Sequence, residues 1–129
     1  MTIEHLGVWV DDLEGMRNFY LTYFDLTSNE KYTNARTGFT SYFLSFGEGK
    51  TRLELMHRAD ISEEPTKRGF SKGLAHFAIS VGNDEAVDRL TERLRADGYT
   101  IASEPRRTGD GYYESVVLDP EGNYVEIAG

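Results

Sequence analysis

The sequence predicts an α+β domain made of two βαβββ modules, and three observations support this fold class. Both halves of the 129-residue chain show an apolar strand, an amphipathic helix and three further strands, in that order. Each half carries a His in its first strand and a Glu in its last, 49 residues apart (5 to 54) and 50 residues apart (76 to 126). Gly-rich turns separate the later strands. The modules are 1–57 and 74–129, joined by a charged linker at 58–73.

The first module opens with a predicted strand at Ile3–Val10 and a helix at Leu13–Phe24. Leu13, Met16 and Phe19 recur at helical spacing and form the apolar face of this helix. Asp12 precedes the helix and suits an N-cap, because its carboxylate can accept orphan backbone N–H groups. The remaining strands are predicted at Thr27–Thr33, Gly38–Phe46 and Thr51–His57.

The second module repeats this order, with a strand at Leu74–Val81 and a helix at Glu85–Ala96. Asn83 is the matching N-cap candidate, and Gly98 suits the left-handed position that ends a helix. The last three strands are predicted at Thr100–Pro105, Tyr112–Leu118 and Asn123–Ala128.

The composition excludes several classes of function. The net charge is −8, with 22 acidic and 14 basic residues, so a nucleic-acid partner is not expected. No apolar run is long enough to span a bilayer, and the N-terminal MTIEHLGVWV lacks the basic region of a signal peptide. The chain has no Cys, which fits the predicted cytoplasmic location and limits any metal site to nitrogen and oxygen ligands.

Strand parity brings the candidate metal ligands to one face of each sheet. Side chains alternate along a strand, and all four candidates fall opposite the aliphatic stripe. If the two modules close on each other, two imidazoles and two carboxylates meet, a ligand set that suits Ni²⁺, Co²⁺, Zn²⁺, Mn²⁺ or Fe²⁺. The alternative is a salt bridge, in which Arg52 or Arg58 neutralises Glu54. The predicted metal ligands are His5, Glu54, His76 and Glu126.

Three segments carry a resemblance to a known family: HLGVWVDDLEGMRNFY (5–20), GLAHFAIS (73–80) and LDPEGNYVEI (118–127). They are similar to signatures of the vicinal-oxygen-chelate superfamily, which includes glyoxalases, bleomycin resistance proteins and dioxygenases. The resemblance implies a glyoxalase-like fold with curved sheets that enclose a metal cavity. Glu54 makes the set most similar to glyoxalase I, the lactoylglutathione lyase, because thiol transferases and extradiol dioxygenases of the superfamily use three protein ligands.

The resemblance implies a reaction and roles for the ligands. A glyoxalase I-like lyase isomerises the hemithioacetal of a 2-oxoaldehyde such as methylglyoxal and a thiol, through a metal-bound enediolate. By this matching Glu126 is the base, Glu54 shares or returns the proton, and His5 and His76 hold the metal. The implied cofactor is one divalent transition metal per site, with Ni, Zn or Co preferred, and a thiol is the implied co-substrate.

Residues at the predicted substrate pocket depart from the family pattern. Small bacterial glyoxalases bind glutathione with an Arg four residues after the first His and an Asn four after the first Glu, where this chain has Trp9 and Arg58. A different thiol or a non-thiol substrate is therefore possible. Phe39, Tyr42 and Tyr113 are the other candidates for the pocket, although each also suits ordinary packing in a core, turn or interface.

Two alternatives to the glyoxalase I reaction stay open at this point. One is another metal-dependent enzyme of the superfamily, an epimerase or a thiol transferase. The other is a metal-free protein that binds a small ligand or confers resistance to it. The resemblance also implies a homodimer in which each site takes His5 and Glu54 from one chain and His76 and Glu126 from the other, with a site inside one chain as the alternative.

Overall fold

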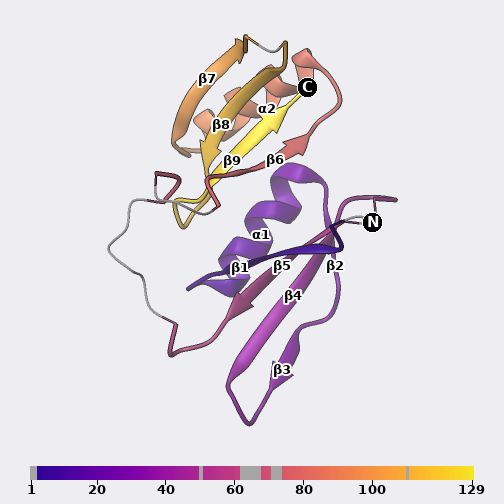
Figure 1. Ribbon diagram of the computed structural model, residues 1–129, viewed down its shortest axis with the longest axis vertical. Helices are drawn as coiled ribbons and strands as arrows, with labels where there is room; N and C mark the ends of the chain where they lie inside the picture. The colour runs from indigo at the N-terminus through magenta and orange to yellow at the C-terminus, as the bar shows by residue number, and fades with distance from the viewer. Residues whose placement is uncertain (1–2, 50, 62–67, 71–73, 110) are drawn as a thin grey trace. The chain divides into compact units, whose positions relative to one another are not determined.

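The computed structural model describes residues 3–49, 51–61, 68–70, 74–109 and 111–129. The chain divides into two compact units, Met1–Glu64 and Pro65–Gly129, and each contains one sheet with one helix packed on it (Figure 1). None of the helices in the described part of the chain has the length and apolarity needed to span a membrane.

The first unit has a mixed sheet in the order β1-β5-β4-β2, with β3 also paired to β4. β1 runs parallel to β5, and the other pairs are antiparallel. The single strand predicted at Thr27–Thr33 is two short strands, because Asn29 interrupts the ladder and its side chain accepts a hydrogen bond from the Phe43 backbone N–H. The elements are β1 (His5–Trp9), α1 (Leu13–Phe24), β2 (Thr27–Ser28), β3 (Tyr32–Asn34), β4 (Phe39–Ser45) and β5 (Arg52–His57).

The second unit has a four-stranded sheet in the order β6-β9-β8-β7. Its first and last strands are parallel neighbours, as in the first unit. The predicted pair of βαβββ modules in an α+β fold is therefore confirmed. The elements are β6 (Phe77–Ser80), α2 (Asp84–Ala96), β7 (Ile101–Arg107), β8 (Tyr113–Leu118) and β9 (Tyr124–Ala128).

Both helices begin at the predicted caps. The Asp12 carboxylate accepts a hydrogen bond from Gly15 N at 2.9 Å, and the Asn83 side chain accepts one from Ala86 N at 2.9 Å. α2 is followed by Gly98, whose positive φ of 89° lets the chain turn out of the helix.

The core of each unit lies between its helix and one face of its sheet. In the first unit Leu53 and Leu55 are buried, and in the second unit Val125 and Ile127 are buried in the same way. Because neighbouring side chains of a strand point to opposite faces, the residue between each of these pairs must lie on the face away from the helix. The core thus fixes the direction of Glu54 and Glu126.

Candidate functional site

In the first unit the candidate ligands His5 and Glu54 lie next to each other on the face of the sheet away from α1. Glu54 pairs with Gly7 in the parallel register of β1 and β5, so His5 lies two residues before the strand partner of Glu54. Nε2 of His5 is 3.7 Å from Oε2 of Glu54.

The second unit repeats this arrangement. Glu126 pairs with Ala78, and His76 again lies two residues before the strand partner of the Glu. Nε2 of His76 is 3.4 Å from Oε2 of Glu126. The near-constant spacing between His and Glu in the sequence therefore corresponds to the same diagonal placement of the two side chains in both units.

Burial differs between the two residue types in the same way in both units. The Glu54 and Glu126 side chains are 14% and 18% exposed, whereas His5 and His76 are 43% and 51% exposed. A carboxylate shielded to this extent loses much of its hydration and is stabilised by a cation close to it. Each unit therefore presents an accessible imidazole beside a carboxylate with restricted access to water.

The salt-bridge alternative for Glu54 does not hold. Arg52 forms its ion pair with Glu4, and Arg58 forms its ion pair with Asp60 at 2.5 Å. Among the described residues, the ionisable side chain beside Glu54 is therefore that of His5, an arrangement that fits a role as a metal ligand.

The donor atoms fit a divalent transition metal. With metal–ligand bonds of about 2.1 Å, neighbouring ligand atoms stand about 3.0–3.4 Å apart. The separations of 3.4 and 3.7 Å are close to this value. Within the described residues no three His, Asp or Glu side chains are grouped to hold a metal ion, since each unit by itself contributes one His and one Glu. A four-ligand site requires both pairs.

The third histidine of the chain has a structural role. Nδ1 of His57 lies 2.9 Å from the backbone carbonyl oxygen of Val10, to which it is placed to donate a hydrogen bond. His57 follows Leu53 and Leu55 at even spacing in β5, so it shares their face of the sheet.

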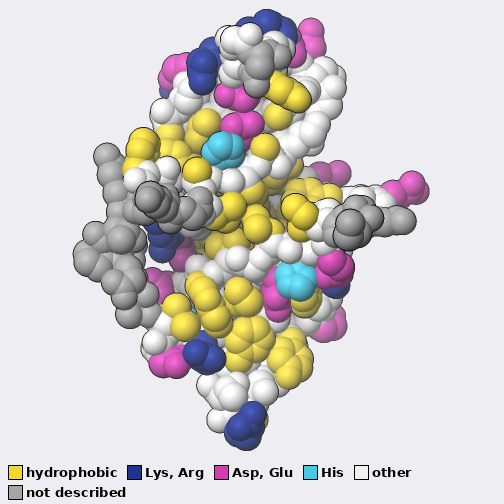
Figure 2. All heavy atoms as spheres, in the orientation of Figure 1, with side chains coloured by type: hydrophobic (Ala, Val, Ile, Leu, Met, Phe, Trp, Pro, Cys, Tyr) yellow, Lys and Arg dark blue, Asp and Glu magenta, His cyan; other side chains and the backbone are white. Residues whose placement is uncertain are grey.

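An aromatic cluster lies on the same face as His5, at the far end of the sheet. The rings of Trp9 and Phe39 meet edge to face at 6.1 Å, and Tyr32 lies 6.1 Å from Phe39 on its other side. Trp9 and Tyr32 are exposed. In Figure 2 hydrophobic side chains gather on this unit near a histidine. The structure thus brings together three of the five predicted substrate residues, Trp9, Phe39 and Arg58, whose guanidinium lies 5.7 Å from the Trp9 ring centre.

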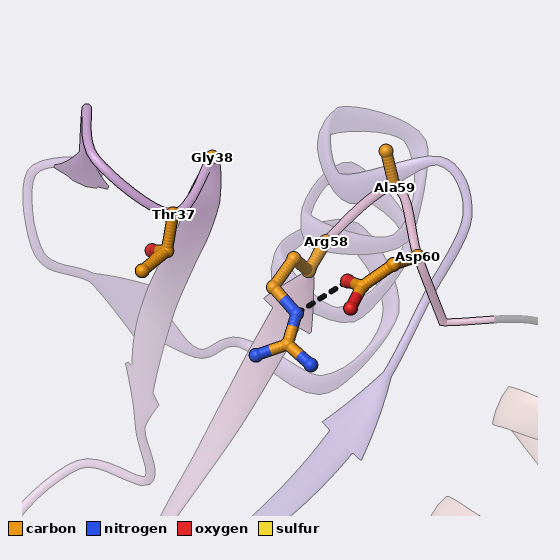
Figure 3. A pocket seen from close by; sticks show the side chains of 5 residues that line it. All are labelled: Thr37, Gly38, Arg58, Ala59 and Asp60. Carbon is orange, nitrogen blue, oxygen red and sulfur yellow. Dashed lines mark hydrogen bonds and ion pairs between the residues drawn. The ribbon is translucent and has the colours of Figure 1, made fainter.

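Arg58 also borders a hollow of about 380 Å³, lined by Thr37, Gly38, Arg58, Ala59 and Asp60 (Figure 3). Its Nε donates to the Asp60 carboxylate, and this hydrogen bond lowers the pKa of Asp60. The two terminal nitrogens of Arg58 point away from Asp60 (Figure 3) and form no hydrogen bond with any residue that the structure describes. They are therefore available to an anionic group of a ligand.

Tyr42 and Tyr113 lie on the opposite, helix-facing side of their sheets, which corrects their assignment to the substrate pocket. The Tyr42 hydroxyl lies 3.2 Å from both carboxylate oxygens of Glu14 in α1, and burial raises its pKa. The Tyr113 hydroxyl donates to Asp88 of α2 at 2.8 Å, and this bond raises its pKa. Each hydroxyl thus forms a hydrogen bond between a sheet and the helix packed on it.

Asp119, in the turn before β9, positions the strand that carries Glu126. Its Oδ1 accepts the backbone N–H groups of Glu121 and Asn123, and its Oδ2 accepts the side-chain amide of Asn123. The buried carboxylate thereby fixes the β8–β9 hairpin. These bonds give a physical role to the Asp of the LDPEGNYVEI segment, which leads into the strand that carries Glu126.

Glu4 is a residue of the site that sequence reasoning missed. Its carboxylate lies 2.5 Å from Nδ1 of His5 and also contacts Arg52. The available signal was a carboxylate directly before the first candidate ligand. Two consecutive residues of a strand point to opposite faces of the sheet, which would keep their side chains apart. Glu4 precedes β1, so this alternation does not apply to it and its carboxylate can reach the His5 ring.

Comparisons with known proteins agree with this fold. An uncharacterized protein of Bacillus subtilis (strain 168), YqjT, is 27% identical over 128 residues, which cover 97% of this chain and 96% of that protein. The trypanothione-dependent glyoxalase I of Leishmania major superposes with a TM-score of 0.78 at 22% identity, covering 100% of this chain and 86% of that one. A glyoxalase I mutant from Zea mays superposes with a TM-score of 0.77 at 26% identity, covering 98% of this chain but 43% of that one.

The family follows from a match over nearly the whole chain. Residues 2–127 match the family model described as the Glyoxalase/Bleomycin resistance protein/Dioxygenase superfamily. The matched range includes both His–Glu pairs and both βαβββ modules. The chain therefore belongs to the Glyoxalase/Bleomycin resistance protein/Dioxygenase superfamily.

Proposed function

We propose that this protein is a metal-dependent lyase of the glyoxalase I type, which isomerises the hemithioacetal formed by a 2-oxoaldehyde and a thiol. The observation that carries the proposal is the repeated His–Glu pair, with Nε2–Oε2 separations of 3.7 and 3.4 Å. Glu54 supports this reaction over others of the superfamily, because it lies beside His5 while the neighbouring arginines form ion pairs elsewhere.

The four residues His5, Glu54, His76 and Glu126 would hold one divalent ion, with Ni, Zn or Co as the candidates. Imidazole and carboxylate are suitable ligands for these metals. When bound, such an ion withdraws electrons from two neighbouring substrate oxygens and so makes the adjoining C–H group acidic.

Glu126 is the proposed base. Its carboxylate takes the proton from the hydroxyl-bearing carbon of the hemithioacetal and gives it to the neighbouring carbonyl carbon, with Glu54 sharing the transfer. One C–H bond breaks and another forms, and the hydroxyl proton passes from the first substrate oxygen to the second, so the step is an isomerisation that needs no external oxidant or reductant. The low exposure of both carboxylates supports this role, because a general base must reach the substrate C–H group without bulk water between them.

The assembly that we propose is a homodimer. Each unit supplies one His–Glu pair, and we propose that a complete site joins the first unit of one chain with the second unit of another. The alternative is that both units of a single chain close on one ion. The protein is proposed to work in the cytoplasm, without a nucleic-acid or membrane partner.

The remote part of the substrate is proposed to bind at Trp9, Phe39 and Arg58. Trp9 and Phe39 offer aromatic surface for a flat or apolar group, and Arg58 offers two terminal nitrogens to a carboxylate. This chemistry differs from that of the family's glutathione site, so we propose an acid with an apolar body as the thiol or 2-oxo compound. The trypanothione-dependent enzyme of Leishmania is a protein of similar fold that uses another thiol.

The exposed aromatic cluster also favours a second candidate, a metal-free protein that binds a flat ligand. Trp9 and Tyr32 expose large apolar surfaces that a stacked ligand would cover. A different metal-dependent enzyme, such as an epimerase or thiol transferase, is a third candidate. Such an enzyme would use His5, His76 and Glu126 as metal ligands without needing Glu54.

Elemental analysis of untagged protein purified without chelator tests the proposal first. We expect about one Ni, Zn or Co per complete site. The loaded protein is then assayed with methylglyoxal and a panel of thiols. Protein that contains no metal and takes up neither Ni²⁺ nor Zn²⁺ would refute the enzyme proposal and favour ligand binding.

A further inference from the structure

Glu4 joins His5 to Arg52 at the edge of the proposed metal site. Its Oε2 is 2.5 Å from Nδ1 of His5, and its Oε1 forms an ion pair with the Arg52 guanidinium. The backbone carbonyl of Glu4 also accepts a hydrogen bond from Arg52 N at 2.9 Å, which fixes Glu4 beside β5. Glu4 is therefore held by both its main chain and its side chain.

We infer that Glu4 is a positioning residue, which sets the tautomer and the ring orientation of His5 so that Nε2 faces the metal. The inference rests on the proposed function for the identity of the ligand that Nε2 takes. The effect of Glu4 on the tautomer and orientation of the His5 ring is independent of the proposed function.

The tautomer follows from the hydrogen-bonding capacity of a carboxylate. An ionised carboxylate only accepts hydrogen bonds, so the Nδ1 atom that lies against Glu4 must carry the proton. In a neutral imidazole Nε2 then has the lone pair, and Nε2 is the atom that faces Glu54. A metal needs that lone pair as its ligand, and a carboxylate on the other nitrogen keeps the imidazole in this tautomer.

The ring orientation follows from contacts on a second side of the imidazole. The Phe43 ring meets His5 edge to face at 5.4 Å and 88°, and the Arg52 guanidinium lies 4.1 Å from the Phe43 ring centre. Glu4, Arg52, Phe43 and His5 thus form a closed set of contacts, here called the His5 brace. The brace restricts rotation of the imidazole before any ligand arrives.

Among the residues that the structure describes, the brace is present in the first unit only. The residue before His76 is Ala75, which has no side-chain acceptor, and the polar contact of His76 within the described residues is with Glu126. The two imidazoles of the proposed site therefore differ, with His5 oriented in advance and His76 free to adjust when the metal binds.

The test uses Glu4→Ala, with Glu4→Gln as the conservative variant and Glu104→Ala as the control. Glu104 is a fair match, because its side chain is 67% exposed against 60% for Glu4 and it also pairs with an arginine, Arg95. Two readouts are measured: Zn²⁺ affinity by competition with a chromophoric chelator, and the His5 tautomer in metal-free protein by ¹⁵N NMR of the imidazole.

In metal-free wild-type protein we expect the proton of His5 on Nδ1, and in Glu4→Ala we expect a shift towards the Nε2-protonated form. Zn²⁺ affinity should fall about 10- to 100-fold in Glu4→Ala, less in Glu4→Gln, and should not change in Glu104→Ala. An unchanged tautomer in Glu4→Ala would overturn the inference, as would Zn²⁺ affinity equal to that of the control. If the wild type binds no Zn²⁺ but the tautomer still shifts, the proposed function fails and the role of Glu4 stands.

Discussion

Glu54 stands opposite Gly7 in the parallel pairing of β5 with β1, which places its carboxylate diagonal to the imidazole of His5. Gly7 has no side chain, and Met56 of β5 packs over it: a Cβ at Gly7 would lie 2.9 Å from Cε of Met56. Glu126 has the small residue Ala78 in the same place. Each carboxylate therefore has a small residue as its register partner.

Complementation between variant chains tests whether the ligands come from two copies. His5→Ala and His76→Ala should each lose metal binding as pure proteins. Mixed after unfolding and refolding together, half of the dimers pair one chain of each kind, and each of these has one intact site. We expect about a quarter of the wild-type metal content to return. No recovery would place all four ligands in one chain.

Glu126→Gln tests the proposed base. The amide keeps the shape of the side chain but cannot take the proton, so turnover of the hemithioacetal should fall about 10²- to 10⁴-fold. Metal content, measured alongside, should be reduced far less than in His76→Ala. Turnover equal to the wild type with metal retained would remove Glu126 from the mechanism.

Arg58→Ala tests the binding of the remote group. Losing a charged hydrogen-bonding partner costs about 1.5–3 kcal/mol, so KM for carboxylate-bearing substrates should rise about 10- to 100-fold while kcat changes little. Arg58→Lys should recover part of the loss, because it keeps the charge but not the planar fork. Arg89→Ala in α2 is the control. An equal rise in KM for substrates without a carboxylate would argue against the assignment.

Glu14 gives a pH-dependent contribution to stability. Its pKa is lowered from the usual 4.5, first by the hydrogen bond from Lys31 and also by that from Tyr42. A lowered folded-state pKa stabilises the protein above about pH 4.5, and this contribution is lost as the pH falls through the folded-state pKa. Glu14→Gln should therefore have a lower Tm than the wild type at pH 7, by an amount worth less than about 1 kcal/mol, since the pair is exposed. The difference should shrink as the pH falls below 4.5 and vanish at a pH low enough to protonate Glu14 in the folded protein. A difference that persists there would mean that packing, and not charge, is responsible; Glu48→Gln serves as the control.

Asp119→Ala should destabilise the second unit. The change removes an acceptor of three hydrogen bonds from a buried position, which costs about 2–3 kcal/mol. Chemical denaturation measures the loss, and hydrogen exchange of the β9 amides locates it. Asp119→Asn retains one carbonyl acceptor and should lose less. Equal losses in the two variants would show that the charge of Asp119, and not its geometry, holds the turn.

Local signals in the sequence were enough to predict most of the elements, although the strand predicted at Thr27–Thr33 is divided into β2 and β3. α1 begins and ends at the predicted residues, because Asp12 marks its start and the apolar period is regular up to Phe24. The sheet face on which Glu54 and Glu126 lie could also be predicted, since each of them stands between two aliphatic residues of its strand. Parity is unambiguous there.

Parity was ambiguous in β4 and β8, and this is where the sequence reasoning went wrong. Apolar or aromatic residues occupy both faces of these strands, so alternation alone did not show that Tyr42 and Tyr113 contact the helices. Glu4 was missed for a different reason, because its contacts depend on where Arg52 reaches from a strand 48 residues later. The joining of the two His–Glu pairs stays a prediction, since it depends on assembly and not on the local pattern.

The division of the four proposed ligands between two compact units has a consequence for how tightly an ion could be held. Neither unit can saturate a metal by itself, so the binding free energy must include that of bringing two units together. If those units belong to different copies, dilution would release the metal, and chelators would separate the copies. Metal occupancy would then report on protein concentration, and the dissociation constant of the ion would be meaningful only when the concentration of chains is stated with it.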